Sequence, residues 1–258
     1  MKIAVCVKYV PDAAADRSFS ADHTTDRVGS IGILSELDEY AVEEALKIRE
    51  AGDAEVIVLT MGPDGAETAL KKALQMGADR AVHVSDPGLH GADAPATSLV
   101  LANAISRLEV DLVLCGMAST DAIMGVVPAM IAERLGLPQV TLAAELTVDG
   151  GAVRIRRDGE DAVEEIEASL PAVVSVTDQI NEPRYPSFKG IMAAKKKTVE
   201  TWSLSDLDVV PDQVGLGAAW SAVTKVTRRP PRSKGTVVTD DGTGAAQLAD
   251  FLAANRFV

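Results

Sequence analysis

Aromatic residues, cysteine and long apolar runs are all scarce in this chain of 258 residues. Its two cysteines, Cys6 and Cys115, each lie in an apolar strand-like run and lack the spacing of metal ligands. We therefore expect two buried free thiols, a state that suits the reducing cytoplasm. No apolar run reaches the roughly 18 residues that a membrane-spanning helix needs, and the first residues do not resemble a signal peptide. The sequence thus predicts a soluble protein without direct membrane insertion.

Positive charge is scarce as well. The chain has 25 Lys and Arg residues against 38 Asp and Glu residues, a formal net charge of −13. Because nucleic acids and anionic membranes bind to basic surfaces, neither is the expected main partner. One exception is the acid-free stretch of residues 213–239, which holds Lys225, Arg228, Arg229, Arg232 and Lys234. This stretch is either a solvated basic tail or, as we favour, an arm that lies on a complementary subunit.

Short apolar, β-branched runs alternate with longer segments of helical period over the first 135 residues. The predicted strands are residues 2–10, 55–61, 80–85 and 111–116, and the predicted helices are residues 38–50, 65–76, 94–108 and 124–135. In the first helix an apolar face is opposed by charged residues that we place in solvent, among them Glu43, Glu44 and Glu50. The alternation predicts an α/β fold of the doubly wound, Rossmann-like, adenine-nucleotide-binding kind, with a mostly parallel sheet covered on both faces.

The pattern changes after residue 138. Residues 152–157 and 162–169 flank a glycine-containing turn and predict a hairpin, which adds an antiparallel edge before a further strand at residues 171–176. Gly, Pro and polar residues dominate from residue 211 until a last helical segment, whose apolar face holds Leu248, Phe251 and Leu252. We predict an α/β domain over residues 1–210, and an arm with a docking helix over residues 211–258. The alternative is that this helix packs back on its own domain.

A proline-broken segment follows the strand at residues 171–176. Residues 183–186 begin and end in proline, so they fit neither a long helix nor a central strand, and the chain leaves its core there. Large apolar residues and a run of three lysines come next, at Phe188, Ile191, Met192, Lys195, Lys196 and Lys197. No acidic residue occurs from residue 184 to residue 198. An exposed apolar group beside a basic cluster is typical of a partner-docking element.

Residues 116–127 are the most informative candidate for a ligand site. In a doubly wound sheet, ligands bind outside the carboxyl ends of the strands, and here Ser119, Thr120 and Asp121 follow a predicted strand. Gly125 lets the backbone approach a ligand closely, and the helix that starts nearby offers free amides to a phosphate. A simple helix cap by Thr120 or Asp121 accounts for the loop almost as well. The histidines and carboxylates form no pattern that indicates catalysis or metal binding.

Several segments resemble the electron transfer flavoprotein beta subunit. The sequence Asn-Glu-Pro-Arg-Tyr at residues 181–185, and the Ile-Met-x-Ala-Lys-Lys-Lys pattern at residues 191–197, are similar to the recognition loop of that family. The family signature upstream is matched at Ile155, Arg156, Asp158, Gly159, Glu160, Glu165, Leu170, Pro171 and Ala172. Residues 223–232 and 238–252 also resemble the family, so the similarity extends along the whole chain.

The resemblance implies that this chain holds a structural AMP. Carried over position by position, it indicates Cys6, Leu37, Asp38, Met61, Asp121, Gly125, Val126 and Val127. The family's commoner loop has Asp, Thr and Gln where this chain has Ile123, Met124 and Val126, so several side-chain contacts to phosphate are missing and backbone amides remain. Bifurcating members carry a second FAD in place of AMP, and the sequence leaves that choice open.

The resemblance also implies a non-catalytic electron-carrier subunit in the cytoplasm of a bacterium. An alpha subunit would hold the redox-active FAD, acyl-CoA dehydrogenases of fatty acid β-oxidation would dock, and a membrane quinone oxidoreductase would receive the electrons. The implied partner-binding residues are Arg184, Tyr185, Phe188, Ile191, Met192, Lys195, Lys196 and Lys197, with Phe188 where relatives commonly have leucine. The competing class is an ATP pyrophosphatase or a nucleotide sensor of the universal-stress type. The chain lacks the phosphate loop of the first and the glycine spacing of the second.

Overall fold

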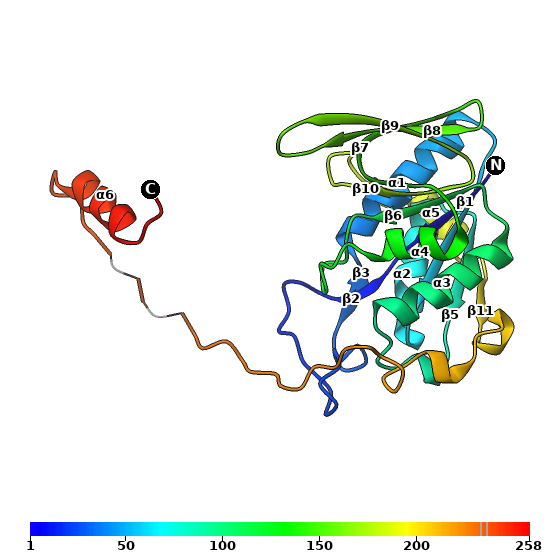
Figure 1. Ribbon diagram of the computed structural model, residues 1–258, viewed down its shortest axis with the longest axis horizontal. Helices are drawn as coiled ribbons and strands as arrows, with labels where there is room; N and C mark the ends of the chain where they lie inside the picture. The colour runs from blue at the N-terminus through cyan, green and yellow to red at the C-terminus, as the bar shows by residue number, and fades with distance from the viewer. Residues whose placement is uncertain (233, 236) are drawn as a thin grey trace. The chain divides into compact units, whose positions relative to one another are not determined.

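Two compact units make up the computed structural model, which describes residues 1–232, 234–235 and 237–258 (Figure 1). The first unit is Met1–Thr224 and the second is Lys225–Val258. The first unit continues past residue 210 because Val214 is buried and the Leu216 amide donates a hydrogen bond of 2.7 Å to the His90 carbonyl. Residues 233 and 236, which belong to the predicted arm, lie outside the described residues.

A nine-stranded sheet forms the centre of the first unit, in the order β11-β5-β4-β1-β6-β10-β7-β8-β9. Its strands are β1 (Lys2–Cys6), β4 (Glu55–Met61), β5 (Arg80–Val84), β6 (Leu112–Gly116), β7 (Gln139–Asp149), β8 (Ala152–Asp158), β9 (Val163–Ser169), β10 (Ala172–Val176) and β11 (Val199–Trp202). All pairs from β11 to β7 are parallel. The run predicted as one strand at residues 2–10 is divided, because its last part, β2 (Tyr9–Pro11), pairs with β3 (Gly32–Leu34) in a second, antiparallel sheet.

Helices cover both faces of the large sheet (Figure 1). They are α1 (Glu36–Ala51), α2 (Glu67–Met76), α3 (Ala94–Leu108), α4 (Val127–Leu135) and α5 (Phe188–Ala194), with short 3-10 turns η1 (Asp64–Ala66), η2 (Pro87–Leu89), η3 (Ser205–Leu207) and η4 (Pro211–Gln213). Leu46 of α1 and Leu70 of α2 belong to one buried cluster, whereas Ile105 of α3 and Ile131 of α4 belong to the other. The predicted doubly wound α/β fold is confirmed.

The central strands read as continuous apolar runs because both of their faces are covered. Successive side chains of a strand point to opposite faces of the sheet. Ile3 and Val5 of β1 accordingly pack in the cluster with α1 and α2, and Ala4 packs in the cluster with α3 and α4. All five residues of β6 and of β10 are buried in the same manner.

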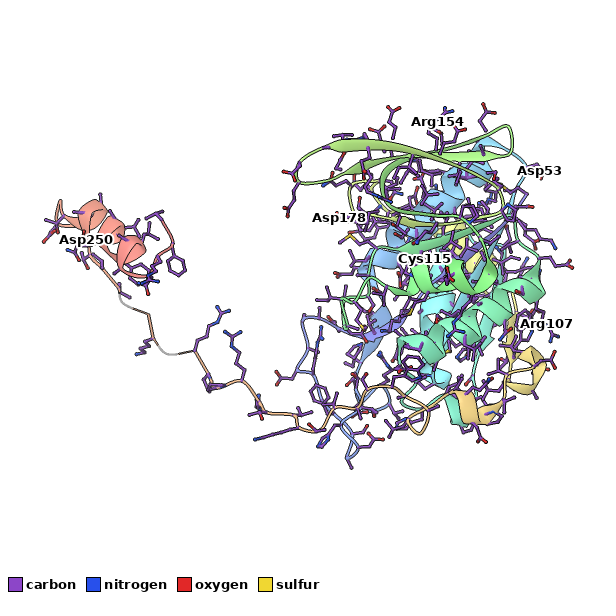
Figure 2. The ribbon with its side chains drawn as sticks, viewed as in Figure 1. Asp53, Arg107, Cys115, Arg154, Asp178 and Asp250 are labelled. Carbon is purple, nitrogen blue, oxygen red and sulfur yellow. The ribbon has the colours of Figure 1, made fainter. Side chains whose placement is uncertain are left out.

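The predicted antiparallel edge is confirmed in the three strands β7, β8 and β9, which follow one another in an antiparallel meander. Strand β9 is largely exposed, and its glutamates face arginines of β8. Arg154, on the outer side of this part of the sheet (Figure 2), donates from Nε to Glu167 Oε2 over 3.0 Å. Such exposed cross-strand pairs contribute little to stability, because water screens the two charges.

The second unit contains α6 (Gly244–Ala254), close to the predicted last helix. None of its residues is buried, and Leu248 and Phe251 are exposed. The rings of Phe251 and Phe257 lie 6.4 Å apart between their centroids. Among the described residues, no helix combines the length and the apolar character that crossing a bilayer requires.

Candidate functional site

The amino end of α1 lies directly against the carboxyl end of β6. Gly116 permits this approach, since an added Cβ would lie 2.5 Å from Asp38 Oδ1 and 2.7 Å from the Leu37 carbonyl oxygen. The Thr120 amide donates to Ser35 Oγ over 3.4 Å at the same junction. The structure therefore brings together the segment before the first helix and residues 116–127, which we call the nucleotide loop.

Asp38 is a buried carboxyl at this junction. Its Oδ2 accepts a hydrogen bond of 2.8 Å from the Lys8 amide. Burial raises the pKa of Asp38 to about 7, although the hydrogen bond from the Lys8 amide and the charge of Lys8 act in the opposite direction. Near neutral pH this carboxyl is therefore divided between its neutral and its charged form.

Asp121 is the charged counterpart of Asp38. Its side chain is only 4% exposed, and its two oxygens lie 2.9 Å from Lys8 Nζ and 2.5 Å from Arg27 Nη2. Burial opposes ionisation, but the charges of Lys8 and Arg27 and their hydrogen bonds hold the pKa of Asp121 well below its usual range. Lys8 and Arg27 thus both bind the single carboxylate of Asp121, which leaves an excess of positive charge there, although burial lowers the pKa of Lys8.

Two arginines of this site were missed by sequence reasoning. Arg17 and Arg27 lie in the connection between β2 and β3, and Arg17 donates to the carbonyl oxygens of Asp121 and Thr120 over 2.9 and 2.8 Å. Arg27 also donates from Nη1 to the Tyr9 carbonyl over 3.0 Å. The connection has no periodic pattern, and its contacts span some 100 residues of chain, so only its isolated cations could have drawn attention to it.

The remaining predicted cofactor residues lie along the same edge of the sheet. Cys6 ends β1 and Met61 ends β4, and both pack, with Val127, beside the core cluster of α3 and α4. Val126 directly precedes α4, and Gly125 has a φ of +66°, a conformation that glycine adopts without strain. A glycine backbone, a helix start and excess positive charge fit an anionic nucleotide group. In the described residues, no cluster of three or more His, Cys, Asp or Glu could hold a metal ion.

Two of the three departures from the family's commoner loop face outward, and the third, Val126, is half-buried. Ile123 and Met124 are 73% and 61% exposed. Ile123 also has a φ of +55°, which is unusual for a β-branched residue. The buried contacts of the loop are instead made by Asp121 with Lys8 and Arg27.

The two cysteines are neighbours in the sheet. Cys6 and Cys115 are register partners of the parallel strands β1 and β6, and both are free thiols. Cys115 lies within the helix-covered sheet (Figure 2) and is buried as predicted, whereas Cys6, also predicted to be buried, is half-buried at the carboxyl end of β1. A hydrogen bond with Cys6, together with burial, raises the pKa of the Cys115 thiol well above its usual value.

Residues 181–197, which we call the docking segment, expose apolar side chains at their centre. Tyr185 is 91% exposed and Phe188 is 80% exposed, and Met192 is also exposed. Phe188 is the first residue of α5, and Ser187 caps this helix by accepting a hydrogen bond of 3.0 Å from the Gly190 amide. Lys195 and Lys196 are exposed just beyond the helix, while Ile191 is half-buried. The cationic and apolar groups thus share one surface segment.

Arg184 of the docking segment is bound to its own domain. Its guanidinium pairs with Glu43 over 2.7 Å and with Glu50 over 2.5 Å, both on α1. These hydrogen bonds, from Glu50 and then Glu43, raise the pKa of Arg184 further above its usual value.

The burial of two α1 carboxylates corrects a prediction. We expected Glu43 and Glu44 on a solvated helix face, but they are 6% and 4% exposed. Arg184 covers Glu43, and Asn181 donates from Nδ2 to Glu44 Oε2 over 3.0 Å. The prediction was wrong because helical periodicity reflects only the helix itself. It cannot reveal that the docking segment, some 140 residues later in the sequence, returns to cover α1.

Further contacts hold the docking segment on α2. An added Cβ at Gly190 would lie 2.4 Å from the Gln75 carbonyl oxygen, so α5 packs closely on the end of α2. Lys197 Nζ donates to the Ala78 carbonyl. Among the predicted partner-binding residues, Tyr185 and Phe188 are therefore presented outward, whereas Arg184 and Lys197 are engaged within the chain.

Comparison with known proteins gives a consistent result over nearly the whole chain. Residues 23–207 match the model of the electron transfer flavoprotein domain. A curated relative named electron transfer flavoprotein subunit beta, from Mycobacterium tuberculosis, is 46% identical over 99% of both chains. One of the same name from Megasphaera elsdenii is 35% identical over the full length of both. A relative from Acetobacterium woodii, named Caffeyl-CoA reductase-Etf complex subunit CarD, is 36% identical over 98% of this chain and 96% of its own.

Proposed function

The chain belongs to the electron transfer flavoprotein family as a beta subunit, and we propose that it transfers electrons from acyl-CoA and related dehydrogenases to a membrane quinone oxidoreductase. As a beta subunit it has an alpha subunit as its partner. The redox-active FAD would be held mainly by that alpha subunit, in the cytoplasm, and this chain would contribute no catalytic residue of its own. The flavin would supply the electron-transfer chemistry. The residues of this chain would bind the alpha subunit, and would orient the docking segment and present it to the dehydrogenase.

The observation that carries the proposal is the exposed pair Tyr185 and Phe188 on the docking segment. Its base, which contains Arg184 and Gly190, is fixed to α1 and α2. Exposed rings beside one another are typical of a surface that a partner covers, and a preorganised apolar side chain loses little entropy on binding. Lys195 and Lys196 beside it favour association with an acidic rim around a pocket. The test is reduction of the purified heterodimer by an acyl-CoA dehydrogenase of the same organism loaded with its acyl-CoA substrate. Failure of every such dehydrogenase to reduce it would contradict the proposed route.

For the nucleotide loop we propose structural AMP, with its phosphate near Lys8, Arg27 and the amides that precede α4. The positive excess at Asp121 and the positive φ of Gly125 support an anionic group there. Asp38 and Leu37 would border the same ligand from α1. Nucleotide released from the denatured heterodimer, identified by its mass, tests the assignment. Recovery of no adenine nucleotide would contradict it.

For the basic stretch and α6 we propose an arm that clasps the alpha subunit. The support is that α6 has no buried residue within its own unit, although it carries Leu248 and Phe251. Truncation after Thr224 keeps the whole first unit, and we expect it to abolish co-purification with the alpha subunit while the shortened chain stays folded. Unchanged co-purification would show that the arm is not the main clasp.

A second candidate is a bifurcating beta subunit with FAD in place of AMP. It is favoured by the 36% identical relative whose name places it in a complex with a reductase. The absorbance spectrum of the chain purified without its alpha subunit separates the two. We expect a colourless chain, whereas stoichiometric, reducible flavin would favour the second candidate.

A further inference from the structure

The docking segment combines an exposed centre with a fixed base, and its only arginine belongs to the base. We propose that Arg184 is a positioning residue, which together with Glu43 and Glu50 sets the direction in which Tyr185 and Phe188 are presented to a partner with an apolar pocket. This inference rests on the proposed docking function and deepens it, because it separates the residues that hold the segment from those that touch the partner.

The geometry of the arginine is that of a fork between two carboxylates. Nε and Nη2 donate to the two oxygens of Glu43 over 2.7 and 2.9 Å, and Nη1 and Nη2 donate to the two oxygens of Glu50 over 2.5 and 3.0 Å. The Arg184 amide adds a hydrogen bond of 3.2 Å to Glu43 Oε2. Glu43 and Glu50 are seven residues, or two turns, apart and therefore share one face of α1. A planar guanidinium can satisfy both carboxylates at once, and a lysine ammonium cannot.

The buried Glu43 makes this contact obligatory. Its side chain is 8% exposed, so it requires a partner for its charge, and Arg184 supplies one. By contrast, the Arg154–Glu167 pair between β8 and β9 has side chains that are 63% and 54% exposed and can separate at little cost. The fork therefore ties the segment to the helix more firmly than a surface ion pair would.

The chain between the fork and the exposed ring is short and stiff. Pro183 and Pro186 flank Arg184 and Tyr185 and restrict φ on either side. Only three residues separate Arg184 from Phe188, which begins α5. On the far side, Gly190 rests against α2. With both sides held, the direction of the Phe188 ring depends on where the guanidinium binds.

The second tie to α1 comes from Asn181. Its Nδ2 donates to the Tyr40 carbonyl and to Glu44 Oε2, each over 3.0 Å. This contact lies upstream of Pro183, so it anchors the entry of the segment and leaves the orientation of the centre to Arg184. Losing the fork should loosen residues 185–193 without detaching the whole segment.

The test compares Arg184→Lys and Glu50→Gln with the control Arg154→Lys. Arg184→Lys keeps the charge and loses the fork. Glu50→Gln weakens the fork without leaving a buried charge unpaired, because Glu50 is half exposed. Arg154→Lys alters an exposed Arg–Glu pair far from the segment in sequence. Amide hydrogen exchange of residues 185–193 in the purified heterodimer is measured first, because it requires no dehydrogenase.

We expect exchange in this segment to rise roughly tenfold in both fork variants, since a segment that loses its tie to α1 opens more often. Reduction by a substrate-loaded acyl-CoA dehydrogenase should then show a KM raised roughly tenfold, with kcat changed by less than about twofold. Flavin content and reduction by dithionite should equal those of the parent. Arg154→Lys should match the parent in every measurement.

Unchanged exchange in both fork variants would overturn the inference, as would unchanged KM for a parent that is readily reduced. A fall in kcat with no change in KM would also overturn it, because that pattern indicates a role in electron transfer itself. If no dehydrogenase reduces even the parent, the proposed function fails, and the exchange measurement still decides whether the fork orders the segment.

Discussion

The nucleotide loop and the docking segment are both held by a buried ion pair, but they expose different groups. In the nucleotide loop the polar group turns inward, and Asp121 is buried between Lys8 and Arg27, while Ile123 and Met124 point to solvent. In the docking segment Arg184 also turns inward, onto Glu43, but its neighbours Tyr185 and Phe188 are exposed. Each loop therefore uses a buried ion pair to fix its backbone, and the two differ in what that backbone presents.

The two segments differ in whether the groups that hold the backbone are also the groups that a ligand or partner would meet. In the nucleotide loop the charged cluster lies at the carboxyl edge, where ligands bind to such sheets, so the groups that hold the loop also set the field that a ligand meets. In the docking segment Arg184 is engaged in holding the base, and the proposed recognition is left to the exposed rings and to the exposed Lys195 and Lys196. Mutations should consequently affect stability and function together in the first loop and separately in the second.

The largest expected effect is on the nucleotide loop. Asp121→Ala leaves Lys8 and Arg27 without their carboxylate, so the free energy of unfolding in urea should fall by roughly 3 kcal/mol. Glu167→Ala, which removes an exposed partner of Arg154, is the control and should leave stability unchanged. Equal stability of the two variants would mean that the buried pair does not hold the loop.

In the docking segment the expected effect is on docking alone. Phe188→Ala should weaken docking to the dehydrogenase by about 2 kcal/mol or more, since a presented ring of this kind acts as a hot spot. Stability, flavin content and dithionite reduction should stay the same, because the ring is already in solvent. Val163→Ala, another exposed apolar residue, is the control. Loss of flavin or of stability in Phe188→Ala would contradict the expectation that stability and docking are independent in this segment.

A matched pair of glycines tests whether the nucleotide loop contacts its ligand by backbone. Gly125 and Gly136 both have positive φ, +66° and +63°, and no atom would obstruct a Cβ at Gly136. Replacement by valine should cost each about 1–2 kcal/mol of backbone strain. Only Gly125→Val should also lower the adenine nucleotide recovered from the purified heterodimer. Equal nucleotide content in both variants would remove Gly125 from the site.

The smallest expected effect is on pH dependence, and here the two buried carboxyls of the nucleotide loop act in opposite senses. The pKa of Asp38 is raised to about 7 in the folded chain, from 3.8. Between these values the folded state holds more protons than the unfolded state, so the contribution of Asp38 to stability falls as pH rises from about 4 to about 7. The pKa of Asp121 is lowered, so its contribution is full above about 4 and is lost as pH falls below that value.

The measurement is the melting temperature of the parent and of Asp38→Asn between pH 5 and pH 8. The amide does not titrate, so the parent should lose melting temperature relative to the variant as pH rises through this window. A constant difference between the two proteins would show that Asp38 does not titrate there.

Local patterns in the sequence were sufficient for most of the fold. The apolar runs of β4, β6 and β10 and the helical period of α3 were located within one or two residues, because their burial on a parallel sheet is written in consecutive residues. Strand β11 and helix α5 had no such pattern. Strand β11 is short, and α5 has no buried residue.

The sequence by itself thus determined the doubly wound layers, the antiparallel edge and the family, since periodicity and local motifs encode these. Only the tertiary structure decided that Lys8, Arg17 and Arg27 surround Asp121, and that Arg184 closes over Glu43 instead of facing a partner. The physical reason is range. Periodicity reports which face of an element is apolar, whereas an ion pair between residues 100 or more apart in sequence depends on how the loops return to the sheet, and no local pattern records that path.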